Sequence, residues 1–383
     1  MSVSSGDLDR HLLLDVAQAA LTKAKKLGAS QSEVSMSSSV GASVGVRKGE
    51  LETIEHNRDK SVSLSVYFQH KDGGQKTGSA STSDLSISAV EEAVAAACAI
   101  ASHTGHDDAL GLADAELMAD DVSDMDLDYP WDGSVDDMRE AALECESAAT
   151  GLDKRIGNTE GANYSSHRGL EVYANSHGFC ADYYSTQHGY SVSVIAMEGG
   201  EMQRDYWYSS ERNPDELDSV ESVGVTAAER ALQKLGSRRI PTGEYPVIFD
   251  ATVSGSLISH LLSGISGGLL YKKASFLTDQ LGEKIFPETI DIFEHPRLYS
   301  AMNSACFDGE GVATPDQRGV VEGGYLRGYV LGSYTARKLD MQSTANSGGV
   351  RNVRVSHGDK TRDDLLRDMG TGLLVTDFIG SGI

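Results

Sequence analysis

Apolar residues near the N-terminus recur every three or four positions. This spacing runs from Asp9 to Leu27, and Gly28 follows directly, where a glycine often ends a helix. A second stripe with the same period begins near Ser88, and Glu91 three residues later would complete a capping box. The pattern therefore predicts two helices in the N-terminal part of the chain.

Between these helices, apolar residues alternate with polar ones. Residues 62–68 place an apolar side chain at every second position, and the turn residues at 72–74 predict a hairpin into a second strand over 75–81. The order of helix, antiparallel strands and helix is typical of a two-layer α+β unit. We assign this helix and antiparallel-sheet domain to residues 1–106.

A strongly acidic stretch follows this domain. From Asp107 to Asp128 there are nine acidic residues and no basic residue. Spaced single aspartates could form a metal-binding tract, but they are more typical of a solvated connector. We therefore interpret residues 107–133 as an acidic connector.

The next part, residues 134–240, alternates helices with strands. A helix over 134–149 is followed by long antiparallel hairpins, which show period-two alternation between turns rich in asparagine and glycine. Asn213 as N-cap and Pro214 as the first helical residue predict a further helix up to Leu235.

The C-terminal part, residues 241–383, mixes short strands with helices. A strand over 247–249 runs into an apolar helix that contains His260, and glycine turns separate later segments. We expect a strand-rich, antiparallel, barrel-like α+β unit with helices. Because the chain ends just after the apolar run 373–375, we also expect it to be a truncated form of a longer protein.

The composition of the chain argues against several kinds of function. The chain has 383 residues, 39% of them hydrophobic, and a formal net charge of -24. This acidity disfavours binding to nucleic acid, because phosphates would be repelled. The N-terminus lacks a basic region followed by an apolar one, so we expect no signal peptide, and no apolar run in the sequence is long enough for a membrane span. Four cysteines without a Cys-x-x-Cys pair fit a reducing compartment, so we expect a cytoplasmic protein.

Two patterns resemble catalytic or metal-binding motifs without meeting their requirements. Residues 264–268 match Gly-x-Ser-x-Gly, but a nucleophile elbow lies between a strand and a following helix, whereas this serine ends a helical stretch. His167, His177 and His188 could supply a zinc site. Their spacings of 10 and 11 residues do not bring the rings together, so turn and surface roles are favoured.

For two further sites the sequence allows more than one interpretation. Asp308 and Glu310 flank Gly309, and a plain acidic turn is favoured there over a cation-binding loop, because the other ligands of a calcium loop are missing. His260 lies at the edge of the apolar stripe of its helix. It is either a hydrogen-bonded residue at the helix edge or part of a peptide cleft.

Several segments in the same order as in a known family give the chain a specific resemblance. The chain resembles the TldD/PmbA family, and within it the PmbA (TldE) branch, over essentially its whole length. The matching segments are RIGNTEG (155–161), YANSHGF (173–179), MQRDYWY (202–208), PVIFD (246–250), FDGEGVAT (307–314), GSYTARKL (332–339), STANSGG (343–349) and MGTGLLVTDFIGSG (369–382).

The resemblance implies a cytoplasmic proteolytic complex. In this family a TldD-type subunit holds zinc through a His-Glu-x-x-x-His helix, and a PmbA-type subunit pairs with it to enclose a cavity. Unfolded or leader peptides are held there as an added β-strand and trimmed, a binding mode that suits edge strands. Family members also continue past the final glycine-serine-glycine segment with further strands.

This sequence departs from the family's metal helix. Ser259, His260 and Gly264 stand where the first histidine, the glutamate and the second histidine would be. Serine and glycine cannot replace imidazole ligands, and without a bound metal no water is activated. We therefore expect no catalytic residue, metal ligand or cofactor in this chain, and zinc in the partner subunit.

The resemblance also indicates residues for the peptide cavity. We select Asn158, Glu160, His177, His260 and Arg337. One alternative function is a non-enzymatic modulator of DNA gyrase or its inhibitors, and another is a self-sufficient peptidase with zinc on the scattered histidines. The sequence does not predict the natural substrate, the cleavage specificity, the homo-oligomeric state, or whether the acidity reflects a saline habitat.

Overall fold

The computed structural model describes residues 8–378 and divides into two compact units. Unit 1 comprises the described residues up to Arg238 together with Tyr299–Ser304. Unit 2 comprises Arg239–Leu298 and the described residues from Ala305 onward. Both units combine helices with mainly antiparallel strands, which confirms the α+β class.

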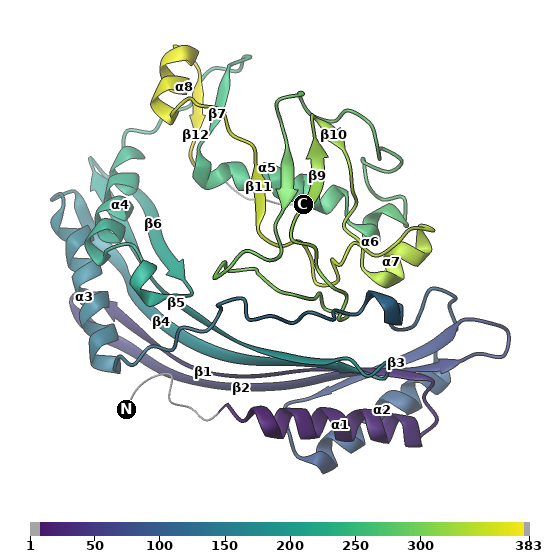
Figure 1. Ribbon diagram of the computed structural model, residues 1–383. Coiled ribbons are helices and arrows are strands. Elements are labelled where there is room, and N and C mark those ends of the chain that lie inside the picture. Colours follow the sequence, from purple (N-terminus) through teal and green to yellow (C-terminus); the bar gives the residue numbers. More distant parts are fainter. Residues whose placement is uncertain (1–7, 379–383) are drawn as a thin grey trace. The chain divides into compact units, whose positions relative to one another are not determined.

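A long, curled antiparallel sheet forms the body of unit 1 (Figure 1). Its strand order is β3-β2-β1-β4-β5-β6, so β3 and β6 lie at its edges. Strands from the predicted parts 1–106 and 134–240 therefore share one sheet, joined by the antiparallel pair β1 and β4. The strands are β1 (Gln31–Arg47), β2 (Glu50–Gln69), β3 (Gln75–Thr82), β4 (Ile156–Asn175), β5 (Cys180–Glu198) and β6 (Glu201–Glu211).

Two pairs of helices cover one face of this sheet. On β1, the residues buried against α1 and α2 and those buried against α3 and α4 all have even numbers, and alternate residues of a strand point to the same face. The opposite face of β1 carries serines and glycines. The helices are α1 (Arg10–Lys26), α2 (Ile87–His103), η1 (Ala115–Leu117), α3 (Val135–Gly151), η2 (Pro214–Glu216) and α4 (Val220–Gln233).

Two of the predicted helix starts are wrong. The N-cap of α2 is Ser86 rather than Ser88, and Glu91 forms an ion pair with Lys23 of α1 at 3.1 Å. Asn213 does cap a helical turn at Pro214, but that turn is the short η2. A new helix, α4, then begins after Ser219, because the Ser219 hydroxyl accepts a hydrogen bond from the Ser222 N–H.

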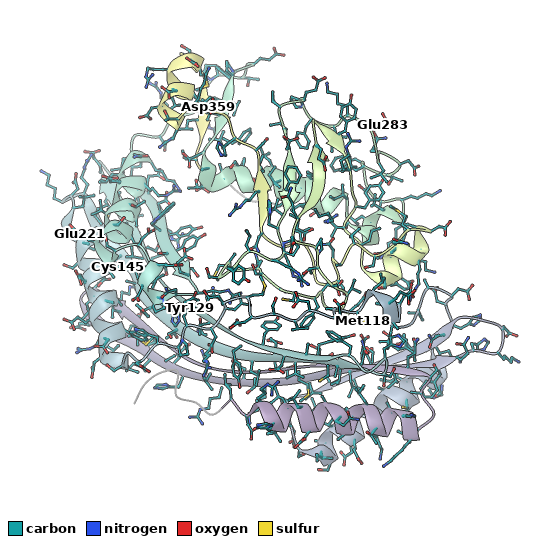
Figure 2. The ribbon with its side chains drawn as sticks, viewed as in Figure 1. Met118, Tyr129, Cys145, Glu221, Glu283 and Asp359 are labelled. Carbon is teal, nitrogen blue, oxygen red and sulfur yellow. The ribbon has the colours of Figure 1, made fainter. Side chains whose placement is uncertain are left out.

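Much of the acidic segment 107–133, which the sequence predicts to be a solvated connector, is packed. The Leu127 carbonyl accepts a hydrogen bond from the Thr186 N–H at 2.9 Å, and Asp128 pairs with Arg168 at 2.6 Å. Figure 2 labels two of its residues, Met118 and Tyr129. The buried apolar residues of the segment are Ala109, Leu112, Ala113, Ala119, Met125 and Leu127.

Unit 2 contains two small sheets. The larger is antiparallel with the order β10-β9-β8-β11, and the smaller is the parallel pair β12-β7. The elements are β7 (Val247–Phe249), α5 (Ala251–Gly264), α6 (Gly267–Leu270), β8 (Ile292–Glu294), β9 (Arg318–Glu322), β10 (Tyr325–Leu326), α7 (Ser333–Lys338), β11 (Val353–Val355), α8 (Arg362–Met369) and β12 (Leu373–Val375).

The predicted barrel-like shape of the C-terminal unit is wrong for the part of the chain that the structure describes. The four-stranded sheet is open, with β10 and β11 at its edges. Loops rather than strands make up much of unit 2, because glycine turns interrupt the apolar runs. Its core is formed by Leu261, Ile265, Leu270, Leu277, Ile292, Val320, Val321, Leu326, Tyr329, Leu331 and Ala336.

Residues 379–383, which include the end of the last family-like segment, lie outside the described residues. Between residues 8 and 378, the helices are too short or too polar to span a bilayer.

Candidate functional site

Helix α5 carries Ser259, His260 and Gly264, the three positions that the family resemblance compares with metal-binding residues. It follows strand β7 directly, and the Asp250 side chain caps it by accepting a hydrogen bond from the Thr252 N–H at 3.1 Å. Arg362 of α8 pairs with the same carboxylate at 3.2 Å. The inner side of the helix is held by buried Leu261 and Gly264. The strand-to-helix arrangement predicted from the apolar run is thus confirmed.

The residues at the three ligand positions do not fit a metal ion. The Ser259 hydroxyl donates to the Gly255 carbonyl at 3.0 Å, so it is used within the helix. The His260 Nδ1 lies 2.7 Å from the Ser256 carbonyl, and because a carbonyl only accepts, this nitrogen carries the proton. His260 is exposed, which agrees with the reading of a hydrogen-bonded residue at the helix edge.

A side chain at the third position would be tightly packed against its neighbours. A Cβ added to Gly264 would lie 3.1 Å from the Leu277 Cδ1 and 3.1 Å from the Phe276 Cε1. Leu277 is buried in the core of unit 2, so it cannot move aside easily. An imidazole at this position would require the 275–277 loop to shift.

A pocket of about 330 Å³ lies beyond the C-terminal end of α5. We call it the glycine-rich pocket. Four segments far apart in the sequence meet there, and three of them are family-like segments: FDGEGVAT, GSYTARKL and STANSGG. The lining residues are Ser266, Gly267, Gly268, Glu310, Val330, Gly332, Tyr334, Thr335, Asn346, Ser347 and Gly349.

Asp308 organises the loops around this pocket. Its buried carboxylate accepts hydrogen bonds from the backbone N–H groups of Glu310, Val312 and Ser347 at 2.9, 3.0 and 2.9 Å. Burial, together with the nearby Glu310, raises the pKa of Asp308 from 3.8 to about 6, although the three N–H donors act in the opposite direction. The acidic turn predicted here is therefore a buried carboxylate that ties two loops together.

Glu310 connects the same loop to α7. One of its oxygens, Oε2, accepts a hydrogen bond from the Ser333 N–H at 2.8 Å. An acidic side chain at the first turn of a helix is favourable, because the N–H groups there have no partner within the helix. The side chain is half-buried and lines the pocket.

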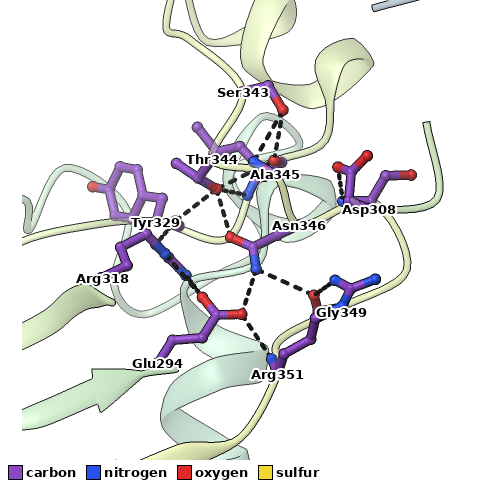
Figure 3. Close-up of polar contacts among 12 residues, drawn as sticks. Glu294, Asp308, Arg318, Tyr329, Ser343, Thr344, Ala345, Asn346, Gly349 and Arg351 are labelled. Carbon is purple, nitrogen blue, oxygen red and sulfur yellow. Dashed lines mark hydrogen bonds and ion pairs between the residues drawn. The ribbon is translucent and has the colours of Figure 1, made fainter. Parts of the chain in front are cut away.

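A second buried carboxylate, Glu294, supports the pocket from the β-sheet side (Figure 3). Its Oε2 accepts two hydrogen bonds from Arg318, at 2.9 and 2.6 Å. Its Oε1 accepts from the Asn346 side chain at 2.8 Å and from the Arg351 N–H at 2.7 Å. The Arg318 Nη1 also donates to the Tyr329 carbonyl at 2.8 Å. The 343–351 loop is therefore fixed to strands β8 and β9.

Unit 1 has a separate hollow of about 310 Å³ on its sheet. We call it the sheet-face hollow, and it is lined by Glu52, Thr53, Glu160, Asn163, Ser193, Arg204 and Tyr206, among others. Glu160 accepts hydrogen bonds from Arg204 at 2.5 Å and Ser193 at 3.0 Å. The hydrogen bond from Arg204, followed by that from Ser193, lowers the pKa of Glu160.

An irregular stretch of β4 places Glu160 at this hollow. The pairing of β4 with β5 shifts register between Ile156 and Asn158 and again between Thr159 and Gly161. Gly161 has a φ of 108°, and a Cβ there would lie 2.4 Å from the Val46 carbonyl oxygen, so glycine is required. Such bulges redirect side chains and occur often beside functional sites.

The five residues predicted for a peptide cavity lie at different places. Glu160 lines the sheet-face hollow, and Asn158 lies two residues before it, half-buried in β4. His177 is exposed in the turn between β4 and β5. In unit 2, exposed His260 lies on α5 and half-buried Arg337 lies on α7, and neither lines the glycine-rich pocket. A common cavity for all five stays a prediction.

The structure does not bring His167, His177 and His188 together as a zinc site. His188 is buried between the Ser166 hydroxyl and the Tyr129 carbonyl, at 2.9 and 3.0 Å. His167 lies one residue from Ser166 along β4, so its side chain points to the other face of the sheet. Among residues 8–378, no group of three His, Cys, Asp or Glu side chains has the arrangement needed for a metal ion.

Sequence reasoning missed Glu294, Arg318 and Asn346. Glu294 stands alone at the end of a short apolar strand, and an isolated acidic residue at such a position is a signal of a buried ion pair. The partner on a strand 24 residues away could not be identified from spacing. The glycines of the pocket were visible, but the sequence did not show that they converge.

Comparison with known proteins gives a consistent result over the whole chain. The models of the PmbA/TldA metallopeptidase match in three pieces: domain 1 at residues 32–101, the central domain at 128–235 and the C-terminal domain at 242–383.

Named relatives cover most of both chains. A metalloprotease PmbA from Escherichia coli O157:H7 is 41% identical over 383 residues, which span 100% of this chain and 83% of that protein. A metalloprotease PmbA homolog from Haemophilus influenzae is 44% identical over 367 residues, which span 95% of this chain and 79% of that protein.

Solved structures share the fold. A crystal structure from Bacteroides thetaiotaomicron, described as a candidate modulator of DNA gyrase, has a TM-score of 0.89 and 29% identity, and covers 96% of this chain and 82% of its own. TldE from Thermococcus kodakarensis has a TM-score of 0.80 at 20% identity, with 96% and 83% covered.

Proposed function

The chain belongs to the PmbA/TldD metallopeptidase family, and we propose that it is the subunit of a two-subunit peptidase that does not carry the metal. In this proposal a TldD-type partner supplies zinc and the hydrolytic water. This chain shapes the binding site for unfolded or leader peptides, in the cytoplasm.

The proposal rests on the contacts that the residues at three positions of α5 make: Ser259, His260 and Gly264. The Ser259 hydroxyl and the Nδ1–H of His260 donate to carbonyls of their own helix, and Gly264 packs against Leu277. Of these three positions only the His260 Nε2 is left as a ligand atom, and one imidazole does not hold zinc. A zinc peptidase needs protein ligands that hold the metal and an open position for water. None of these three residues meets that need, although the family is one of metallopeptidases.

Unit 1 supports a role in holding extended peptides. Strands β3 and β6 form the edges of the sheet, and an edge strand can pair with any extended chain through main-chain hydrogen bonds. On β6, Tyr206 and Tyr208 are 49% and 56% exposed, and their rings stack at 6.4 Å. Side chains of this kind provide apolar contact without strict sequence selection.

A reconstitution assay tests the proposal. The purified chain, a TldD-type subunit and their mixture are each incubated with an unfolded peptide, and the fragments are identified by mass spectrometry. We expect cleavage in the mixture, loss of cleavage with a chelator, and no cleavage by this chain alone. Chelator-sensitive cleavage by this chain alone would contradict the proposal.

Modulation of DNA gyrase is the second candidate, and it derives from the description of the related Bacteroides structure. The net charge of -24 favours a protein target or an imitation of DNA over binding to DNA itself. Affinity purification of the tagged chain from its own cells separates the candidates. A stable gyrase complex supports modulation, and a TldD-type subunit in the same fraction supports the peptidase.

A further inference from the structure

The glycine-rich pocket of unit 2 contains oxygen atoms that the fold leaves unused. Glu310 employs Oε2 to cap α7, but its Oε1 accepts no hydrogen bond from residues 8–378. Ser266 and Ser347 also line the pocket, and their hydroxyl groups form no hydrogen bond within the described part of the chain. Half-buried polar atoms of this kind require water or a ligand as partner.

Gly332 lies beside the unused oxygen of Glu310 and the side chain of Ser347. A Cβ added to Gly332 would lie 3.3 Å from the Glu310 Oε1 and 3.3 Å from the Ser347 Cβ. The φ of Gly332 is -86°, which any residue can adopt. The glycine is therefore not required by the backbone conformation, and its effect is to leave the space beside Glu310 open.

The residues that line the pocket carry negative charge only. Among the eleven lining residues there is one carboxylate and no Lys, Arg or His. In the sheet-face hollow, by contrast, Glu160 is already paired with Arg204 at 2.5 Å. The open carboxylate oxygen of Glu310 thus attracts a cation, and it repels phosphate or a peptide carboxylate.

A primary ammonium group suits this lining better than a metal ion. Calcium takes six to eight oxygen ligands, usually including several carboxylates, and only one carboxylate lines this pocket. An ammonium has three N–H donors and needs no shell of carboxylates: one donor can bond to the Glu310 Oε1, and the others can bond to water or to hydroxyl groups of the lining. A hydrogen bond between charged groups is also stronger than one between neutral groups.

We propose that the glycine-rich pocket of unit 2 binds a primary ammonium group, from a lysine side chain or from the amino terminus of a peptide. This site concerns binding by the isolated chain, so it stands or falls separately from the proposed peptidase complex. The volume of about 330 Å³ accommodates one amino-acid residue.

The test is an NMR titration of the isolated chain with paired probes. Nα-acetyl-lysine amide is compared with Nα-acetyl-norleucine amide, which lacks the ammonium. Alanyl-alanine amide is compared with its N-acetylated form. We expect at least one amine probe to bind about tenfold more tightly than its neutral counterpart, as a charged hydrogen bond implies. The pair that shows this difference identifies the source of the ammonium.

Two variants locate the binding. Glu310→Gln keeps an oxygen for the Ser333 N–H but removes the charge, and Gly332→Ala fills the space without changing any charge. Both should abolish the difference between charged and neutral probes. Glu283→Gln, at an exposed position in the same unit, is the matched control and should retain it.

Three outcomes would overturn the proposal. These are absence of binding by both amine probes, equal affinity for charged and neutral probes, and an undiminished difference in folded Glu310→Gln protein. Amide spectra of each variant establish whether it is folded. If Glu310→Gln does not fold, an undiminished difference in folded Gly332→Ala protein overturns the proposal instead.

Discussion

The buried carboxylate of Asp308 accepts a hydrogen bond from the backbone N–H of Ser347 at 2.9 Å, across a separation of 39 residues. The Gly309 N–H donates in return to the Ser347 carbonyl at 2.9 Å. Two family-like segments are thereby held against each other beside the glycine-rich pocket. The shape of that pocket thus depends on a residue that does not line it.

Replacing Asp308 with Asn should destabilise unit 2 by about 1–3 kcal/mol at neutral pH, because the new amide directs an N–H toward a backbone N–H. The measurement is urea unfolding of the variant and the wild type. Asp316→Asn, at an exposed position nearby, is the control and should change the free energy of unfolding little. Equal stability of Asp308→Asn and wild type would contradict this account of the loop.

The difference in the free energy of unfolding between the wild type and Asp308→Asn should also depend on pH, in a direction that the pKa of Asp308 determines. The pKa of Asp308 is raised from 3.8 to about 6 in the folded protein, so the folded state binds more protons than the unfolded state between these values. Ionisation of Asp308 is therefore less favourable in the folded than in the unfolded state, so its titration lowers the free energy of unfolding as the pH rises from about 4 through about 6, on top of the pH-independent contribution of its hydrogen bonds. In Asp308→Asn this dependence should disappear. Identical slopes for both proteins over this range would contradict the assignment.

Truncating Glu294 to Ala should cost about 3–5 kcal/mol, because Arg318 would remain buried without its partner. The Asn346 amide and the Arg351 N–H would lose an acceptor as well. The control is Glu288→Ala, which removes an exposed pair with Lys284 and should cost less than about 1 kcal/mol. Unfolding in guanidinium chloride measures both values. A similar effect of the two substitutions would show that the Glu294 network does not stabilise unit 2.

Restoring the family's ligand set on α5 should not restore a metal site. In the variant S259H/H260E/G264H, the side chain at 264 would collide with Leu277, which is buried. We expect no stoichiometric zinc in the dialysed variant by elemental analysis, and a lower melting temperature than that of S259H/H260E. Stoichiometric, tightly held zinc in the folded triple variant would show that the 275–277 loop adapts.

His188 fixes the acidic segment to the sheet. Its Nε2–H donates to the Tyr129 carbonyl at 3.0 Å, and its Nδ1 lies 2.9 Å from the Ser166 hydroxyl. Burial lowers the pKa of His188, which favours the neutral ring. His188→Ala should accelerate amide hydrogen exchange at residues 127–129. His177→Ala, in an exposed turn, is the control and should leave that exchange unchanged. Unchanged exchange in His188→Ala would mean that other contacts hold the segment.

The pH dependence of His188 has the opposite sign to that of Asp308. Burial lowers the pKa of His188 below its ordinary 6.5, so the unfolded state binds more protons than the folded state as the pH falls. Its contribution to stability is present above about pH 6.5 and is lost on acidification. His188→Gln should reduce the loss of stability below pH 6.5, as measured by urea unfolding.

Local patterns in the sequence predict the helices and long strands well. The helical period and Gly28 place α1 within one residue at each end, and the turn residues at 72–74 separate β2 from β3. These elements follow from spacing and turn chemistry, which act over a few residues. The split between η2 and α4 was missed, because both Asn213 and Ser219 are good caps and only tertiary packing decides between them.

Sites that depend on distant contacts were predicted poorly. Asp308 and Glu310 look like a surface turn in the sequence, and their burial depends on Ser347 and Ser333. Arg168, the partner of Asp128, lies 40 residues away in the sequence. The sequence therefore predicts a solvated acidic stretch, whereas part of it is packed in the structure. Spacing along one chain does not carry this information, because loops of similar length can close in many ways.

The metal content of the two separated subunits tests the central claim most directly. The active complex is isolated, its subunits are separated under mild conditions without a chelator, and zinc is measured in each by elemental mass spectrometry. The account predicts zinc with the TldD-type subunit and only traces with this chain. Stoichiometric zinc on this chain, lost when Ser259 or His260 is replaced by Ala, would contradict it.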